Sequence, residues 1–281
     1  MDITQEYTIT YDSNGGENGP SKQTKRAGEE LTLSSIIPTR EKYIFKGWGE
    51  TKTATTAAYQ PGGLYNKDGN ATLYAIWALD VYTIKYDSNG GEPIDAEQTK
   101  EKGVNITLIN IVPTRAGYEF LGWSANREAS SPEYLSGGTY TQNANVTLYA
   151  VWKEYTYIVT YNANGGSGVP ANQTKRSTVD LVISATTPTR MGYDFIGWSE
   201  DRTSSTAEYI SGGNYSENKN TTLYAVWKIH SYEITYDANG GNGAPEAGTK
   251  IYGEEYIITS EEPTYVGSTF KGWNSTKTAT S

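Results

Sequence analysis

Few residues of this chain could do catalytic chemistry, and they do not recur together. The sequence repeats with a period of 75 residues, so a catalytic site built into the repeat would recur at equivalent positions. His230 is the single histidine, and Asp80 and Tyr155 stand at the equivalent positions of other repeats. A serine nucleophile needs a histidine that a third group orients, and glycoside hydrolysis needs two carboxylates at a fixed separation. Only the position of Asp12 is acidic in most repeats, so we expect no catalytic residues and no enzyme.

A metal site is weakly suggested by one turn. Asp12, Asn14 and Gly15 resemble the opening of a calcium-binding loop, which requires further oxygen ligands and a glutamate at its twelfth position. Gln23 stands twelfth, and the third repeat starts this turn with Asn162. The chain has no cysteine, which excludes thiol catalysis and cysteine-ligated zinc. We therefore expect turn chemistry here, with no metal and no cofactor.

Lysine and asparagine occupy two invariant positions of the repeat. They are Lys25, Lys100, Lys175 and Lys250, and Asn14, Asn89, Asn164 and Asn239. An isopeptide cross-link between the two side chains would need a buried carboxylate beside them. The simpler interpretation is a solvated Thr-Lys strand and an Asn-Gly turn.

Aromatic residues are the remaining candidates for a binding surface. All seven tryptophans fall at two positions of the repeat: Trp48, Trp123, Trp198 and Trp273, and Trp77, Trp152 and Trp227. With only four phenylalanines in the chain, we expect these tryptophans to form the cores of small modules. Tyr65, Tyr140 and Tyr215 lie beside Gly-Gly turns and are the candidates for surface binding of a glycan or protein.

The repeat itself determines the architecture. The segments YTITYDSNGG, YTIKYDSNGG, YIVTYNANGG and YEITYDANGG begin at Tyr7, Tyr82, Tyr157 and Tyr232, 75 positions apart. The predicted modules are residues 1–78, 79–153, 154–228 and 229–281. The fourth module ends before a closing strand, so we expect a truncated module of low stability.

Each repeat is predicted to be mostly β-structure. Tyr7, Ile9 and Tyr11 alternate with threonines, as in a half-buried strand. Further strands are expected over residues 30–33, 43–48 and 72–77, with a short helical turn over 34–40. The last strand is apolar on both faces, which predicts a central position in the sheet. Four-residue links such as 78–81 lack Gly and Pro, which favours an extended array over a compact globule.

Composition narrows the function further. The chain carries 23 basic and 32 acidic side chains, a net charge of -9, which disfavours binding to nucleic acid or anionic lipid. No apolar run is long enough for a transmembrane helix, and the first residues lack the basic and apolar parts of a signal peptide. We expect no nucleic-acid partner and no insertion into a membrane.

The ordered motifs resemble a known family. The series Y-x-[IV]-x-Y-[DN]-x-N-G-G, P-T-R, G-W, G-G and L-Y-A-[IV]-W is similar to the Listeria–Bacteroides repeat, the B-repeat type of internalins. The resemblance covers nearly the whole chain. The fourth repeat differs, with Tyr265 in place of Arg40 and Gly248 in place of Gln23. The resemblance implies small β-grasp-like (ubiquitin-like) modules, mainly β or α+β, in an extracellular, cell-wall-associated protein.

The function expected from this reading is mechanical. A non-catalytic stalk would hold neighbouring domains of a longer parent chain away from the bacterial surface. The alternative is a multivalent adhesion region that binds a host surface protein or glycan weakly in each repeat. Recurring exposed aromatic residues would favour adhesion, and buried ones would favour the stalk.

Overall fold

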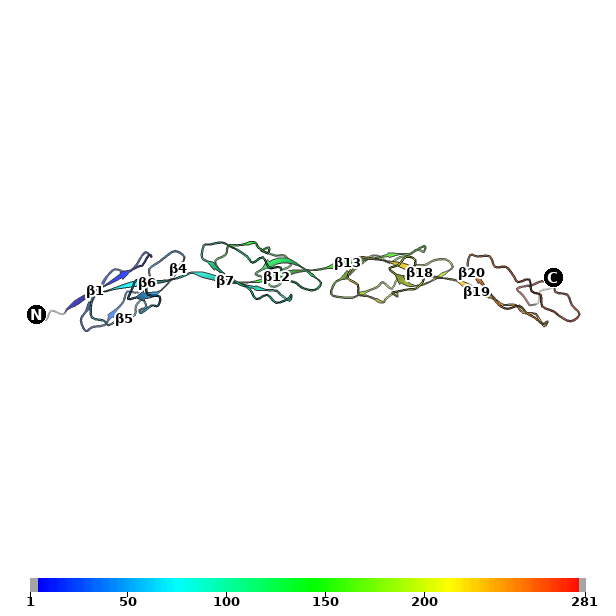
Figure 1. Cartoon of the computed structure of the whole chain (residues 1–281), viewed down its shortest axis with the longest axis horizontal. Coiled ribbons are helices and arrows are strands. Elements are labelled where there is room, and N and C mark those ends of the chain that lie inside the picture. The colour runs from blue at the N-terminus through cyan, green and yellow to red at the C-terminus, as the bar shows by residue number, and fades with distance from the viewer. Residues whose placement is uncertain (1–4, 278–281) are drawn as a thin grey trace. The chain divides into compact units, whose positions relative to one another are not determined.

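The computed structural model describes residues 5–277, and all of its regular structure is β-strand (Figure 1). The first module contains β1 (Glu6–Asp12), β2 (Gln23–Arg26), β3 (Leu31–Thr32), β4 (Tyr43–Gly49), β5 (Leu64–Tyr65) and β6 (Ala71–Leu79). The second contains β7 (Val81–Asp87), β8 (Glu97–Glu101), β9 (Ile106–Thr107), β10 (Tyr118–Ser124), β11 (Thr139–Tyr140) and β12 (Val146–Glu154).

The third module repeats this order, and fewer strands are described for the fourth. The third contains β13 (Thr156–Asn162), β14 (Gln173–Arg176), β15 (Leu181–Val182), β16 (Tyr193–Ser199), β17 (Asn214–Tyr215) and β18 (Thr221–Ile229). Among the described residues of the fourth there are β19 (Ser231–Ile234) and β20 (Gly248–Ile251). The chain divides into two compact units, residues 1–153 and 154–281. Tandem, mainly β modules are thus confirmed.

Each complete module is built on one four-stranded sheet. In the first module the strand order is β2-β1-β6-β4, and the other two complete modules repeat it. β6 runs parallel to β1 and antiparallel to β4, so the closing strand is central, as its apolar faces predicted. A second, two-stranded sheet of β3 and β5 accompanies it.

Burial along the strands follows the sequence pattern. In β1, Ile9 and Tyr11 face the core while Thr8 and Thr10 are exposed. The core of the first module is formed by buried residues that come from β1, β4, β5, β6 and the end of β3: Ile9, Tyr11, Leu33, Trp48, Tyr65, Leu73 and Ala75. Equivalent clusters fill the second and third modules. Each complete module therefore encloses its own core.

A bulge explains the Gly-Trp motif. The register of β4 against β6 shifts between Phe45 and Gly47, and Gly47 has a φ of 126°. A Cβ on Gly47 would lie 2.7 Å from the Tyr59 carbonyl oxygen. Only glycine fits this close approach, which turns Trp48 into the core.

Three local predictions were wrong. Residues 34–40 are not helical, because the Ser34 amide donates to Tyr11 and Gln23 side chains and Thr39 pairs with Glu17. The strand expected over 30–33 is shorter, and the Thr-Lys strand exists as β2, but its lysine is buried and not solvated. The link 78–81 is mostly strand, since all of its residues except Asp80 belong to β6 or β7.

Candidate functional site

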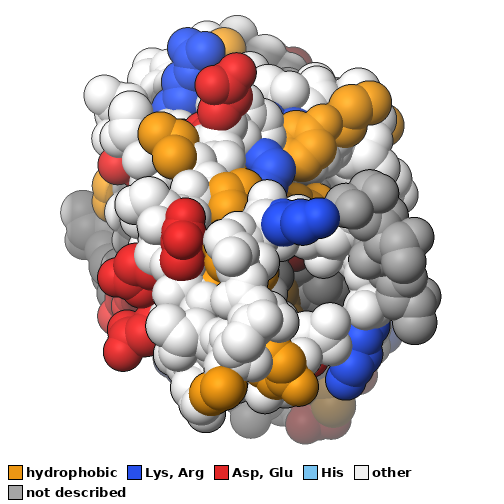
Figure 2. Space-filling view, turned by 90° about the vertical axis from the view of Figure 1, so that its right-hand side faces the viewer, with side chains coloured by type: hydrophobic (Ala, Val, Ile, Leu, Met, Phe, Trp, Pro, Cys, Tyr) orange, Lys and Arg blue, Asp and Glu red, His pale blue; other side chains and the backbone are white. Residues whose placement is uncertain are grey.

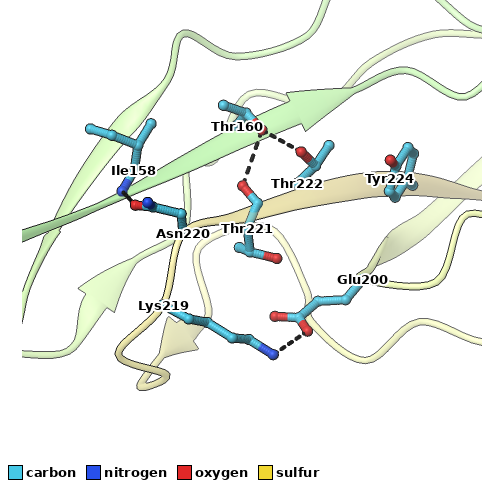
Figure 3. Close-up of a pocket in the computed structure, with 8 residues that line it drawn as sticks. All are labelled: Ile158, Thr160, Glu200, Lys219, Asn220, Thr221, Thr222 and Tyr224. Carbon is cyan, nitrogen blue, oxygen red and sulfur yellow. Dashed lines mark hydrogen bonds and ion pairs between the residues drawn. The ribbon is translucent and has the colours of Figure 1, made fainter.

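One open cleft on the third module is lined mostly by polar side chains at the edge of its sheet. Figure 3 shows the strands β13 and β18 that carry most of its lining. The lining residues are Ile158, Thr160, Glu200, Lys219, Asn220, Thr221, Thr222 and Tyr224. Val159, Leu223 and Ala225 occupy the core face of the same strands, so alternation places Ile158, Thr160, Thr222 and Tyr224 on the outer face. The Thr221 side chain lies on the other side of β18, toward Glu200 (Figure 3).

The hydroxyl and amide groups of the cleft bind each other. Asn220 Oδ1 accepts a hydrogen bond of 2.8 Å from the Ile158 amide. Thr160 Oγ1 lies 2.7 Å from Thr222 Oγ1 and donates to the Thr221 carbonyl at 3.0 Å (Figure 3). These contacts tie β13 to β18 across the parallel pair. Their effect is structural, because the hydroxyls are already partnered.

The charged pair of the cleft is similarly satisfied. Lys219 Nζ lies 2.6 Å from Glu200 Oε2, and the Tyr215 hydroxyl donates to Glu200 Oε1 at 3.0 Å. Burial opposes ionisation of Glu200, but the hydrogen bonds from Lys219, Tyr215 and Thr221 together lower the pKa of this carboxyl. Burial, followed by the bond to Glu200, raises the pKa of Tyr215. At neutral pH the carboxylate therefore stays ionised and the phenol stays protonated, so neither group is suited to transfer a proton.

The charged part of the cleft is not a common feature of the repeat. In the first module Glu50, the equivalent of Glu200, pairs with Lys67, a lysine from a different position of the repeat, and Ala125 replaces the glutamate in the second module. What recurs on this face is a half-buried tyrosine, Tyr74, Tyr149 or Tyr224, on the closing strand. Sequence reasoning missed these tyrosines, although the two-faced apolar strand that carries them was noted.

The tyrosines proposed for surface binding lie in the core instead. Tyr65 is 3% exposed, Tyr140 is 2% exposed and Tyr215 is 0% exposed. Their strands pair with β3, β9 and β15, which turns each ring inward. The prediction that they form a surface is wrong, because adjacency to a Gly-Gly turn did not imply exposure.

The tryptophans occupy three different environments. Trp48, Trp123 and Trp198 are 0% exposed. Trp77, Trp152 and Trp227 are half-buried against the core, and each donates its indole N–H to a carbonyl in the Asn-Gly turn. Trp273 is half-buried beside Tyr236 and Phe270. The structure thus places six of the seven as expected for a core or its border.

The lysine position is buried rather than solvated. Lys25, Lys100 and Lys175 are each 0–1% exposed. Lys25 Nζ bonds to Asp68, whereas Lys100 and Lys175 bond to the side-chain oxygens of Asn143 and Asn218. A lysine at this depth is retained only with hydrogen-bond partners. Lys250 of the fourth module is half-buried and bonds to two backbone carbonyls.

The structure does not bring this lysine to the asparagine of the turn. Asn14 Nδ2 donates to the carbonyls of Lys52 and Ala75, at 3.1 and 3.0 Å. Asn89 and Asn164 repeat the pattern, and Asn239 has only a 3.5 Å contact with the Lys277 carbonyl. The interpretation that these two side chains form an isopeptide cross-link is therefore wrong. The asparagine anchors the turn to the closing strand.

The remaining candidates have structural partners. Asp12 Oδ1 accepts the Asn14 amide at 2.7 Å, which is an Asx turn. His230 Nε2 lies 3.0 Å from Asp194 Oδ1, and its ring faces Tyr232 and Tyr252. Within residues 5–277 no three His, Cys, Asp or Glu side chains come together as a metal site would require. The same residues contain no helix long and apolar enough to span a membrane.

Taken together, these observations define a tandem array of small β-modules, in which each of the first three has its own core. The chain belongs to the Listeria-Bacteroides repeat domain family, whose model matches residues 7–76, 82–151, 157–226 and 232–281.

Three relatives share this region. Two are proteins of Evansella cellulosilytica whose names include the words "membrane protein"; they are 31% and 30% identical to the chain, over 95% of it. The third is Internalin H of Listeria monocytogenes, 30% identical over 53% of the chain. The chain spans 39%, 29% and 25% of the lengths of these relatives, so their other parts have no counterpart here.

Proposed function

We propose that this chain is a non-catalytic spacer in a bacterial surface protein, where it holds neighbouring domains away from the cell wall. The observation that supports this most strongly is the closure of each complete module around its own core. A module that needs no partner for folding can be repeated to add length without changing its neighbours. The names of the relatives, two membrane proteins and an internalin, agree with an extracellular location at the cell surface.

Short, hydrogen-bonded junctions also support a spacer. Between the first two modules, the Asp80 amide donates to the Lys42 carbonyl and the Asp80 carbonyl accepts from the Lys102 amide, both at 2.9 Å. Lys102 Nζ also lies 2.7 Å from Asp80 Oδ2. Between the third and fourth, His230 joins Gly192 and Tyr252 in the same way. A one-residue link with both backbone groups bound restricts bending more than a Gly/Ser linker would.

The test is whether length scales with module number. Small-angle scattering would compare the chain with a version lacking residues 79–153, which removes one whole repeat. A nine-residue closing strand is roughly 30 Å long, so the maximum dimension should fall by about 30 Å. An unchanged dimension, or a more compact array with more modules, would contradict the spacer.

One observation favours the alternative, a multivalent adhesion region. The half-buried tyrosines Tyr74, Tyr149 and Tyr224 recur on the outer face of the complete modules. Weak binding of a glycan or host protein at each would be strengthened by repetition. Beads carrying residues 1–227 at high density should then capture such a ligand, while beads carrying 1–78 should not. Substitution of all three tyrosines by serine should abolish capture.

A further inference from the structure

The outer face of each complete module carries a half-buried tyrosine on its closing strand. The three are Tyr74, Tyr149 and Tyr224. Leu223 and Ala225, the neighbours of Tyr224 along β18, face the core, so alternation turns the tyrosine ring to the other side of the sheet. In the third module this ring lines the open cleft of Figure 3, so a molecule in solution can reach it.

A side chain that can accept a hydrogen bond lies next to this tyrosine. The parallel pairing of the first and closing strands sets Tyr74 opposite Asp12. The corresponding pairs of the other modules are Tyr149 with Asp87 and Tyr224 with Asn162. Asp12 follows the buried Tyr11 along β1, so its carboxylate lies on the outer face beside the ring. The Asx turn engages Oδ1 of Asp12, which leaves Oδ2 able to accept from a ligand.

A basic residue lies near the same tyrosine, and the turn asparagine holds its backbone. It is Lys52, Arg127 or Arg202 in the three complete modules. Each turn asparagine donates, at 3.0 or 3.1 Å, to the carbonyl of this basic residue and to the carbonyl that follows the tyrosine on the closing strand. The three basic side chains are exposed, and the ion pairs found within residues 5–277 do not include them. Their charge is therefore available to a ligand.

The second module shows the cation and the ring together. Arg127 Cζ lies 5.8 Å from the centre of the Tyr149 ring, and Arg127 Nε donates to Asn89 Oδ1 at 3.3 Å. By contrast, Arg115 Cζ lies 3.9 Å from the centre of the Tyr118 ring, a distance at which the guanidinium is stacked on the ring. Arg127 is therefore near enough to donate to a group held against Tyr149 without being stacked on that ring.

The charges around the ring favour an uncharged ligand. In the first two modules an acidic and a basic residue both lie near the tyrosine, and in the third Asn162 replaces the acid. Acidic and basic side chains both reach the surface on the face that Figure 2 shows, and the net charge of -9 disfavours a polyanion. Sugar hydroxyls both donate and accept, and the C–H face of a pyranose is apolar, as the tyrosine ring is.

We propose that this tyrosine, with its acceptor and its basic neighbour, forms a binding site for an uncharged glycan in each complete module. The ring would stack against one pyranose. The carboxylate or amide would accept from one hydroxyl, and the lysine or arginine would donate to another. Each site is small and open, so its dissociation constant should be no lower than roughly 1 mM, and a polymer would gain affinity by occupying several sites. This inference rests on the adhesion alternative of the proposed function and leaves the spacer unaffected.

The test is affinity electrophoresis of the full chain in gels that contain an uncharged polysaccharide: hydroxyethyl cellulose, galactomannan or xyloglucan. At least one of the three should slow migration in proportion to its concentration. Carboxymethyl cellulose, which has the backbone of the first polymer with added carboxylates, should slow the chain at least about threefold less than the best uncharged polymer. Absence of slowing by all three uncharged polymers, or stronger slowing by the carboxymethyl polymer, would overturn the proposal.

Variants of the full chain locate the binding. Alanine at all three tyrosine positions, Tyr74, Tyr149 and Tyr224, should weaken the slowing by at least about tenfold, whereas phenylalanine should keep it within about threefold because the ring remains. Tyr155→Ala should have no effect, since Tyr155 is 45% exposed but lies between β12 and β13, outside the site. Equal effects of the alanine and phenylalanine variants would overturn the proposal.

The basic residues give a second test that does not disturb the sheet. Lys52→Ala, Arg127→Ala and Arg202→Ala together remove exposed side chains, and their backbone carbonyls still accept from the turn asparagines. The slowing should weaken by about three- to tenfold, because each site loses a donor. An unchanged migration would overturn the proposal even if the alanine variants of the tyrosines were misfolded.

Failure of this inference is distinguishable from failure of the adhesion region. If the bead experiment captures a host protein or a charged glycan while no uncharged polymer slows the chain, the adhesion region stands and the uncharged-glycan site is wrong. If the beads capture nothing and no polymer slows the chain, both are wrong. Small-angle scattering tests the spacer separately in either case.

Discussion

The third and fourth modules have closely related sequences and differ in how far they are folded around a core. Trp198 is 0% exposed and sits at a bulge held by a central strand, whereas its equivalent, Trp273, is half-buried in a segment without strand pairing. Both modules keep the first antiparallel pair, β13 with β14 and β19 with β20. The difference indicates that the first hairpin forms locally, while the core and the bulged strand depend on the closing strand.

Substituting the core tryptophan should separate the two modules most strongly. Trp198→Ala removes a fully buried ring and should cost the third module about 3–5 kcal/mol. Trp273→Ala should cost less than about 1 kcal/mol, because that ring is only partly covered. Hydrogen exchange of the strands in each module would measure both values in the intact chain. Equal losses would mean that the fourth module has a closed core in solution.

The glycine before this tryptophan should show the next largest difference. A Cβ on Gly197 would lie 2.5 Å from the Tyr209 carbonyl oxygen, but a Cβ on Gly272 meets nothing within 4 Å. Both have a positive φ, 143° and 141°. Gly197→Ala should therefore cost about 2–4 kcal/mol from clash and strain together, and Gly272→Ala about 1 kcal/mol. Thermal unfolding of the two variants would show which loses more stability. A larger loss for Gly272→Ala than for Gly197→Ala would contradict the prediction.

The asparagine of the turn provides a smaller contrast. Asn164 Nδ2 donates to the carbonyls of Arg202 and Ala225, at 3.0 and 3.1 Å. Glycine accepts the positive φ, so Asn164→Gly removes these bonds alone and should cost about 1–2 kcal/mol. Asn239→Gly should be nearly neutral, since its side-chain amide lies 3.5 Å from the Lys277 carbonyl oxygen and the backbone bond to Asp237 is kept. Denaturant titrations that show the same loss of unfolding free energy for both variants would contradict the view that Asn164 anchors its turn to the closing strand.

The smallest effect concerns acid stability of the first module. The hydrogen bond from Lys25, with that from the Gly28 amide, lowers the pKa of Asp68. A lowered folded-state pKa stabilises the fold above the unfolded value of about 3.9, and this stability is lost as the pH falls through the folded value. The second module has Asn143 at this position and should lack the dependence. Asp68→Asn should remove it from the first module, as exchange rates measured between pH 5 and pH 2 would show.

Much of the fold could be predicted from the sequence because the repeat gives several copies of each signal. The strand of Tyr7 to Tyr11 and the central closing strand follow from alternation and from apolar residues on both faces. The burial of Lys25 in β2 could not be predicted, because a lysine in a polar strand is expected to be solvated and its partner Asp68 lies 43 positions away. The partial exposure of Tyr74 and the burial of Tyr65 likewise depend on which strands pair.

The fourth module also shows how a substitution is accommodated. In the complete modules a core tyrosine bonds to a glutamine of β2, β8 or β14. Gly248 replaces that glutamine, and the Tyr256 hydroxyl enters the space to lie 3.2 Å from the Tyr236 hydroxyl. The sequence shows only that the glutamine is missing, because the tyrosine that fills its place comes from another segment of the chain.

The central claim is that a central strand closes the core of each complete module. The most direct test is hydrogen exchange of the unaltered chain, comparing residues 193–199 with residues 268–274. The account predicts slow exchange in the first segment, which is paired with β18, and exchange close to that of an unfolded chain in the second. Equal protection of the two segments would contradict it, because no strand neighbour of residues 268–274 is found within residues 5–277.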